Sequence, residues 1–134
     1  MVRLSKKVEY GLIAIRHIAT CKGGDLVTAK EIAERYGIPF EMLAKILQLL
    51  TKAGLVASAQ GVHGGYSLAR RPEEIPISMI INAIDGSGPV IAQCLSQGPE
   101  SCLVFDTCTI KSPLTKVQAN IERAFSSMTL SEIV

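Results

Sequence analysis

Three cysteines in the C-terminal half carry the most distinctive chemistry of the sequence. Cys94, Cys102 and Cys108 lie within residues 85–112, a segment rich in Gly, Ser and Pro. Thiolates bind zinc and iron–sulfur clusters, and exposed thiolates are also redox-active. A loop near this length inside a compact domain is unusual unless something functional orders it. The segment therefore predicts a metal, cluster or thiol site.

The cysteine spacing favours an iron–sulfur cluster and leaves zinc and a bare thiol switch open. Structural zinc usually uses a tight C-x₂₋₄-C pair, which this segment lacks, whereas clusters tolerate wider loops. The number of irons, two or four, stays undecided. Three thiolates leave one position of a four-ligand cluster to another side chain. The candidates for that position are Glu9, Asp106, His63 and His17.

Residues 28–55 predict two short helices joined by a tight turn. Thr28 with Glu31 is typical of a capping box at a helix start. Gly37 is suited to end the first helix, Pro39 to occupy the first position of the second, and Gly54 to end that one. Apolar residues recur at helical spacing in both helices, at Ala29, Ile32, Ala33 and Tyr36 and then at Leu43, Ile46, Leu47 and Leu50.

Two such helices are typical of a helix-turn-helix, whose second helix enters the DNA major groove; a helical hairpin without DNA is the alternative. Two short strands predicted at residues 55–59 and 66–70 flank a glycine-rich tip. This hairpin directly after a helix-turn-helix indicates a wing. Arg70 and Arg71 at its base are candidates for phosphate contacts.

The charge distribution supports a nucleic-acid partner. Residues 1–71 hold eleven Lys or Arg against five acidic residues, whereas residues 72–134 hold three against seven. The predicted helix-turn-helix therefore lies in a half with net charge +6, and the cysteines lie in a half with net charge −4. A basic half is expected where a protein faces phosphates.

Three further helices complete the predicted fold. The first begins after Ser5 and ends before Gly23, the next runs from Pro76 to Gly86, and a long last helix starts at Ser112 and Pro113. The last helix carries an apolar seam at heptad spacing, which predicts a two-fold dimer. The seam consists of Leu114, Val117, Ile121, Ala124 and Met128, with Phe125 beside it.

Composition excludes several classes of protein. No apolar run approaches the roughly 20 residues that cross a bilayer, and the N-terminus lacks the apolar block of a signal peptide. We therefore expect a cytoplasmic protein that does not associate with membranes. The sequence shows no paired carboxylates, no phosphate-binding loop and no histidine beside a nucleophile. It therefore gives no indication of an enzyme. A small iron–sulfur electron-transfer protein is the alternative from a different class.

Several motifs together resemble the bacterial regulators typified by IscR and NsrR. These motifs are RLSKKVEYGL at the N-terminus, IPFEMLAKILQLLTKAGLV in the helix-turn-helix, GVHGGYSLAR in the wing, and three cysteines before a long final helix. The resemblance implies a mostly α-helical winged-helix homodimer that binds double-stranded DNA at a palindromic operator. A cluster in each subunit would sense iron–sulfur status, redox state or nitric oxide.

The resemblance also assigns residues. Cys94, Cys102 and Cys108 match the thiolate ligands, and Lys111 stands where IscR-like proteins place a histidine. NsrR-like proteins use an acidic residue from the first helix of the partner subunit, and Glu9 falls at that position. With the cluster bound, the ordered cysteine segment would set the spacing of the two recognition helices.

The predicted organisation has three parts: a winged helix-turn-helix domain at 1–85, a sensor segment at 86–111, and a dimerisation helix with its tail at 112–134. Lys45 and Gln48 are the main candidates for reading bases, because Lys suits guanine and Gln suits adenine. The full set of predicted DNA-contacting residues is Glu41, Ala44, Lys45, Gln48, Lys52, Gln60, Gly61, His63, Gly64 and Arg70.

Overall fold

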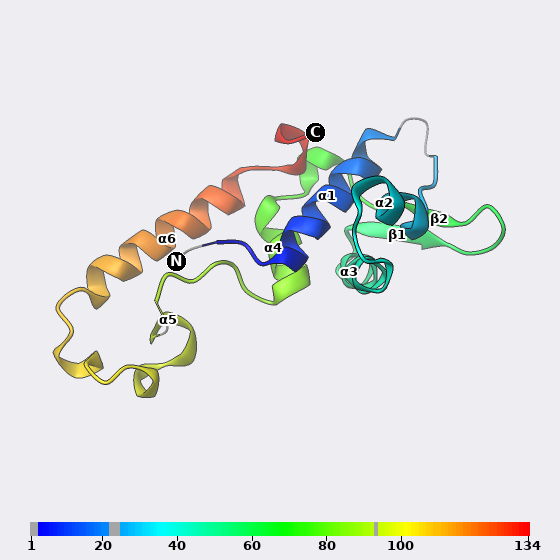
Figure 1. Ribbon diagram of the computed structural model, residues 1–134. Coiled ribbons are helices and arrows are strands. Elements are labelled where there is room, and N and C mark those ends of the chain that lie inside the picture. Colours follow the sequence, from blue (N-terminus) through cyan, green and yellow to red (C-terminus); the bar gives the residue numbers. More distant parts are fainter. Residues whose placement is uncertain (1–2, 22–24, 93) are drawn as a thin grey trace.

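A computed structural model describes residues 3–21, 25–92 and 94–134 and confirms the predicted fold class, mostly helical with one β-hairpin (Figure 1). No helix in this part of the chain is long and apolar enough to cross a membrane. The helices are α1 Lys6–Thr20, α2 Ala29–Tyr36, α3 Phe40–Lys52, α4 Ile77–Asp85, α5 Cys94–Gln97 and α6 Lys111–Ser127. The strands are β1 Val56–Ala59 and β2 Gly65–Leu68, and the 3-10 turns are η1 Pro72–Glu74, η2 Pro99–Ser101, η3 Phe105–Thr107 and η4 Leu130–Glu132.

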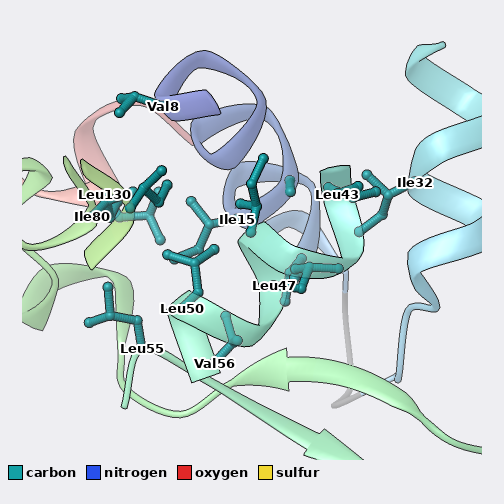
Figure 2. Close-up of a cluster of buried hydrophobic side chains, with 14 of the residues drawn as sticks. Val8, Ile15, Ile32, Leu43, Leu47, Leu50, Leu55, Val56, Ile80 and Leu130 are labelled. Carbon is teal, nitrogen blue, oxygen red and sulfur yellow. The ribbon is translucent and has the colours of Figure 1, made fainter. Parts of the chain in front are cut away.

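The core forms where α1 packs against α3 and α4. Isoleucine and leucine side chains from these helices fill it, joined by Leu130 from the C-terminal turn (Figure 2). Gly11 of α1 is in close contact with both neighbours. A Cβ atom there would lie 2.2 Å from Cδ1 of Ile84 and 3.3 Å from Cγ2 of Ile46. The missing side chain lets the three helices approach closely.

The residues that cap the helix starts agree in part with the sequence prediction. Ser5 Oγ accepts from the Val8 amide (3.2 Å), and Thr28 Oγ1 accepts from the Glu31 amide (3.1 Å). The return bond of a capping box, from the Thr28 amide to the Glu31 carboxylate, is absent from the hydrogen bonds of the described residues. Pro39 was expected as the first helical residue, but its ψ of 125° is extended, so it caps α3. Pro76, with ψ of 145°, caps α4 in the same way.

The turn between α2 and α3 follows the prediction. Gly37 ends α2 with φ of 69° and Gly54 follows α3 with φ of 78°, both in the left-handed region that glycine tolerates. The prediction that Tyr36 belongs to the buried stripe of α2 is wrong, because its side chain is exposed. It lies in the last turn of α2, where its hydroxyl bonds to His17 instead of entering the core.

The wing is an antiparallel hairpin in which Val56 pairs with Leu68 and Ala59 with Gly65. Its second strand begins one residue earlier and ends two residues earlier than expected. Val27 adds a short third segment through two backbone bonds with Tyr66, at 3.0 and 2.7 Å. The hairpin therefore rests against the linker before α2, which fixes the wing relative to the helix-turn-helix.

Helix α6 begins at Lys111, one residue before the expected start, and extends away from the core (Figure 1). Its C-terminal end is bonded to the start of α4. The Ile77 amide donates to the Met128 carbonyl, and the Leu130 amide donates to the Ile75 carbonyl, both at 2.8 Å. Leu130 is fully buried. The core therefore holds one end of α6, and the cysteine segment lies at the other.

Burial of α1 in the core predicts a large contrast between two isoleucines of this helix. Ile15 is 0% exposed and Ile13 is 36% exposed. Removing a fully buried Ile side chain costs about 2–5 kcal/mol of unfolding free energy, so we expect Ile15→Ala to lose that amount. Ile13→Ala is the matched control and should stay within about 1 kcal/mol of wild type. Urea denaturation measures both, and equal losses would contradict this packing.

Candidate functional site

The exposed face of α3 is the centre of the candidate DNA interface. Leu43, Ile46, Leu47 and Leu50 are buried on the opposite face, so the core determines which side of α3 points outward. Glu41, Lys45, Gln48 and Lys52 are exposed, and Ala44 is half-buried. The predicted DNA-contacting residues of this helix therefore lie on one accessible side. Lys45 and Gln48 have the donors and acceptors that read base edges.

Phe40 extends this exposed face of α3, and it was not among the DNA-contacting residues predicted from the sequence. It occupies the first turn of α3 and is 54% exposed. A large aromatic residue exposed at the leading end of α3 suits apolar contact with a thymine methyl group or a deoxyribose. The sequence gives no signal for this exposure, because Phe40 lies three residues before Leu43 and seven before Leu47, a spacing that matches the buried stripe.

The wing tip exposes backbone and small side chains. Gln60, Gly61 and His63 are exposed, as is Arg70 at its base. The Gly64 amide donates to the Gly61 carbonyl (3.0 Å), which closes the tip. A Cβ at Gly64 would lie 2.4 Å from the Ala59 carbonyl oxygen, so the turn requires glycine there.

Arg71 is less available for phosphate than the sequence suggested. Its guanidinium donates two hydrogen bonds to Glu74 Oε1, the shorter at 2.8 Å. The Arg71 hydrogen bond and charge lower the pKa of the Glu74 carboxyl, which favours its ionised form. Both side chains are exposed, so the pair contributes little to stability.

A contact between α1 and α2 lies beside the wing. His17 Nδ1 is 2.7 Å from the Tyr36 hydroxyl, and the two rings meet edge to face. The Arg35 guanidinium lies 5.8 Å from the centre of the Tyr36 ring. Burial and, secondarily, the charge of Arg35 lower the pKa of His17. The imidazole is therefore neutral at pH 7 and links the helix-turn-helix to α1.

The cysteine segment is not the irregular loop that its composition suggested, because three short helical turns bring it together. Turn η2 packs against both α5 and η3. Cys102 and Cys108 directly follow η2 and η3, and both are half-buried free thiols. Cys94 begins α5, and its side chain lies outside the described part.

The candidates for a fourth ligand lie in different places. Asp106 is exposed in η3, between Cys102 and Cys108. His17 and His63 line a pocket of about 720 Å³ between α1 and the wing, at the other end of the molecule from α5 (Figure 1). Glu9 lies on α1, where its carboxylate is 2.9 Å from Lys6 Nζ, and the hydrogen bond and then the charge of Glu9 raise the pKa of Lys6. No three His, Cys, Asp or Glu side chains among those described form a metal site.

The apolar seam residues of α6 differ in burial: some pack inside the chain and others face solvent. Ile121 and Phe125 are half-buried and line a cavity of about 330 Å³ beside α4. Val117, Ala124 and Met128 are exposed, and Leu114 is half-buried. The chain therefore uses part of the predicted apolar seam for its own packing and leaves the rest open to solvent.

Comparisons with known proteins agree with this geometry. Residues 4–134 match the family model Rrf2, described as an iron-dependent transcriptional regulator. The chain is 33% identical over 133 residues to the HTH-type transcriptional regulator IscR of Pectobacterium atrosepticum, covering 99% of this chain and 79% of the relative. It is 29% identical to the NsrR regulator of Oceanobacillus iheyensis, covering 99% and 90%.

Solved structures show the same similarity. T. potens IscR superposes with a TM-score of 0.76 at 35% identity, over 98% of this chain and 85% of that one. CymR, titled the global cysteine regulator of B. subtilis, superposes with a TM-score of 0.77 at 25% identity, over 99% and 96%. The similarity covers the cysteine segment and α6 as well as the winged helix.

The environment of His17 predicts a pH effect on stability. Because the pKa of His17 in the folded protein lies below the ordinary histidine value of 6.5, the unfolded chain binds more protons at acidic pH, and stability falls as pH drops below about 6.5. His17→Gln removes this component, so it should lose less stability between pH 7 and 5 than wild type. His63→Gln at the exposed wing tip is the control and should follow wild type. Urea unfolding at several pH values tests this, and parallel curves for all three proteins would refute it.

Proposed function

The chain belongs to the Rrf2 family of iron-dependent transcriptional regulators, and on that premise we propose a homodimeric, cytoplasmic regulator that reads a palindromic operator and senses through an iron–sulfur cluster. The observation that carries the DNA-binding part is the exposed face of α3. Core packing on the opposite side of the helix holds Lys45, Gln48 and Lys52 outward. Family membership favours a regulator over a small electron carrier.

In this proposal, helix α3, the wing tip and the basic residues Lys52 and Arg70 make different contacts with DNA. Helix α3 enters the major groove, where Lys45 and Gln48 contact base edges and Phe40 adds an apolar contact. Lys52 and Arg70 bind phosphate, and the wing tip follows the backbone with its glycine amides. Glu41 restricts the sequences that α3 accepts, because a carboxylate accepts from cytosine but repels phosphate. Ala44 leaves room between Glu41 and Gln48.

The residues of the cysteine segment suit a cluster. Cys102 and Cys108 are half-buried and each follows a short turn, and α5, which begins with Cys94, packs on η2, the turn before Cys102. Three thiolates from adjoining turns, without a C-x₂₋₄-C pair, fit an iron–sulfur cluster better than structural zinc. When bound, a cluster supplies sensitivity to iron, oxidants or nitric oxide, while this chain's residues supply its position and protein environment.

The fourth ligand is best assigned to Glu9 of the partner subunit. Within one subunit, α1 packs against α3 and α4, whereas α5 packs against η2, so the helix that carries Glu9 and the cysteine segment belong to different sets of contacts. Lys111 is unsuitable because its ammonium is a cation that already donates to the Phe105 carbonyl. The exposed Val117, Ala124 and Met128 support a dimer through α6 that brings the two regions together.

The proposed mechanism has two states. A cluster held by the three cysteines and by Glu9 of the other subunit would link the cysteine segment to α1 of that subunit, which would fix the distance between the two copies of α3. Without that link α1 would no longer be tied to the cysteine segment of the other subunit, and the spacing of the recognition helices would change. A palindromic site with fixed half-site spacing then binds one state better than the other.

The base-reading assignment predicts separable effects of two substitutions. Gln48→Ala should lose about 1–3 kcal/mol of discrimination at one base pair of each half-site. Lys45→Ala should lose discrimination at another position and lower the slope of log affinity against log salt by about 1. Lys116→Ala, an exposed lysine of α6, is the control and should change neither. Fluorescence anisotropy with single-base operator variants measures this; unchanged site preference in both α3 variants would reject the assignment.

The proposed cluster ligands predict how substitutions at these residues change the iron content after anaerobic purification. Cys94→Ala, Cys102→Ala and Cys108→Ala should lose the visible absorption of the cluster, and Glu9→Ala should retain a cluster that a chelator removes faster. Cys21→Ala is the control, since Cys21 lies at the end of α1, and its iron and sulfide should equal wild type. A colourless wild-type protein with zinc and no sulfide would eliminate the cluster and favour a zinc or thiol regulator.

A further inference from the structure

Gln118 of α6 is the only buried polar side chain in the described part of the chain, with 8% of its surface exposed. Both ends of its amide are used. The Ile91 amide donates to Gln118 Oε1 (3.0 Å), and Gln118 Nε2 donates to the Pro89 carbonyl (2.9 Å). Because a backbone amide only donates and a carbonyl only accepts, these partners fix the amide orientation. Gln118 therefore holds residues 89–91, the part of the cysteine segment that precedes Cys94.

Lys111 makes the second connection, two helical turns earlier. Its Nζ donates to the Phe105 carbonyl (2.8 Å) and lies 4.2 Å from the centre of the Phe105 ring. The same carbonyl accepts from the Cys108 amide at 3.4 Å. A cation in the first turn of a helix is unfavourable to the helix dipole. The position of Lys111 is thus explained by its contacts with η3 rather than by α6 itself.

These two side chains lie seven residues apart and therefore on one face of α6. We infer that Lys111 and Gln118 form a clamp that holds both ends of the cysteine segment against α6 before any cofactor binds. We use "clamp" for these two residues only. This inference deepens the proposed function and rests on it for the identity of the cofactor. It assigns positioning roles to two residues that are not ligands.

The clamp has two consequences for sensing. Holding the segment in place reduces the conformational entropy lost when a cofactor binds, which raises its affinity. It also connects the segment to the core, because the C-terminal end of α6 is bonded to α4 through Met128 and Leu130. A change in the cysteine segment therefore acts on a helix that is anchored to α4, which itself packs against α1 and α3.

Amide hydrogen exchange of the full chain, prepared without metal and followed by NMR, tests the clamp directly. The Ile91 amide should exchange about tenfold faster in Gln118→Leu, because it loses its only described acceptor. The Cys108 amide should exchange faster in Lys111→Met and return to wild type in Lys111→Arg, which retains charge and donors. Lys116→Met and Asn120→Leu, exposed positions of α6, are the matched controls.

The pattern separates a clamp from general destabilisation. Protection in the core, followed at Leu47 and Ile80, should be unchanged in every variant, whereas an unfolding α6 would accelerate exchange along the helix. Wild-type rates at Ile91 and Cys108 in Gln118→Leu and Lys111→Met would overturn the inference. After reconstitution with iron and sulfide, both variants should lose the cluster to a chelator faster than wild type. A wild-type protein that takes up no cluster, with the exchange pattern intact, would refute the proposed function alone.

Discussion

The rest of the structure depends on the close packing of α1 against α3 and α4. Gly11 permits that approach, because any larger side chain would meet Ile84 and Ile46. Burial of Ile15 and of the inner face of α3 follows from it, and so does the outward direction of Lys45 and Gln48. The arrangement of the proposed DNA-reading surface is therefore determined by apolar packing on its opposite side, and α1 is in direct contact with the helix that carries that surface.

The second part of the molecule is organised around α6 rather than the core. One end of this helix is fixed by backbone bonds to the start of α4, and the other holds the cysteine segment through Lys111 and Gln118. Apolar burial supports the first end, and polar contacts with few buried side chains support the second. Segments of the second kind open more easily. The chain thus joins the winged-helix part to the cysteine segment by one continuous helix, α6.

Local chemistry explains which features could be predicted from the sequence. The turns at Gly37 and Gly54 and the buried stripe of α3 depend on neighbours within a few residues, and the structure confirms them. Tyr36 was misassigned because its partner, His17, lies 19 residues away on another helix. The role of Gln118 was invisible for the same reason, since it bonds to an amide 27 residues earlier. Ligation by Glu9 stays a prediction, because it depends on contacts between two subunits.

In the proposed function, the state of the cysteine segment controls the affinity of a dimer for DNA. The most direct measurement is operator affinity, at one salt concentration, of the same preparation with its cluster intact and after anaerobic removal of the cluster, with mass measured in both states. We predict a dimer in both states and affinities that differ by at least about tenfold, which corresponds to 1.4 kcal/mol of coupling. Equal affinities, or a monomer that binds the operator as tightly in either state, would contradict the account.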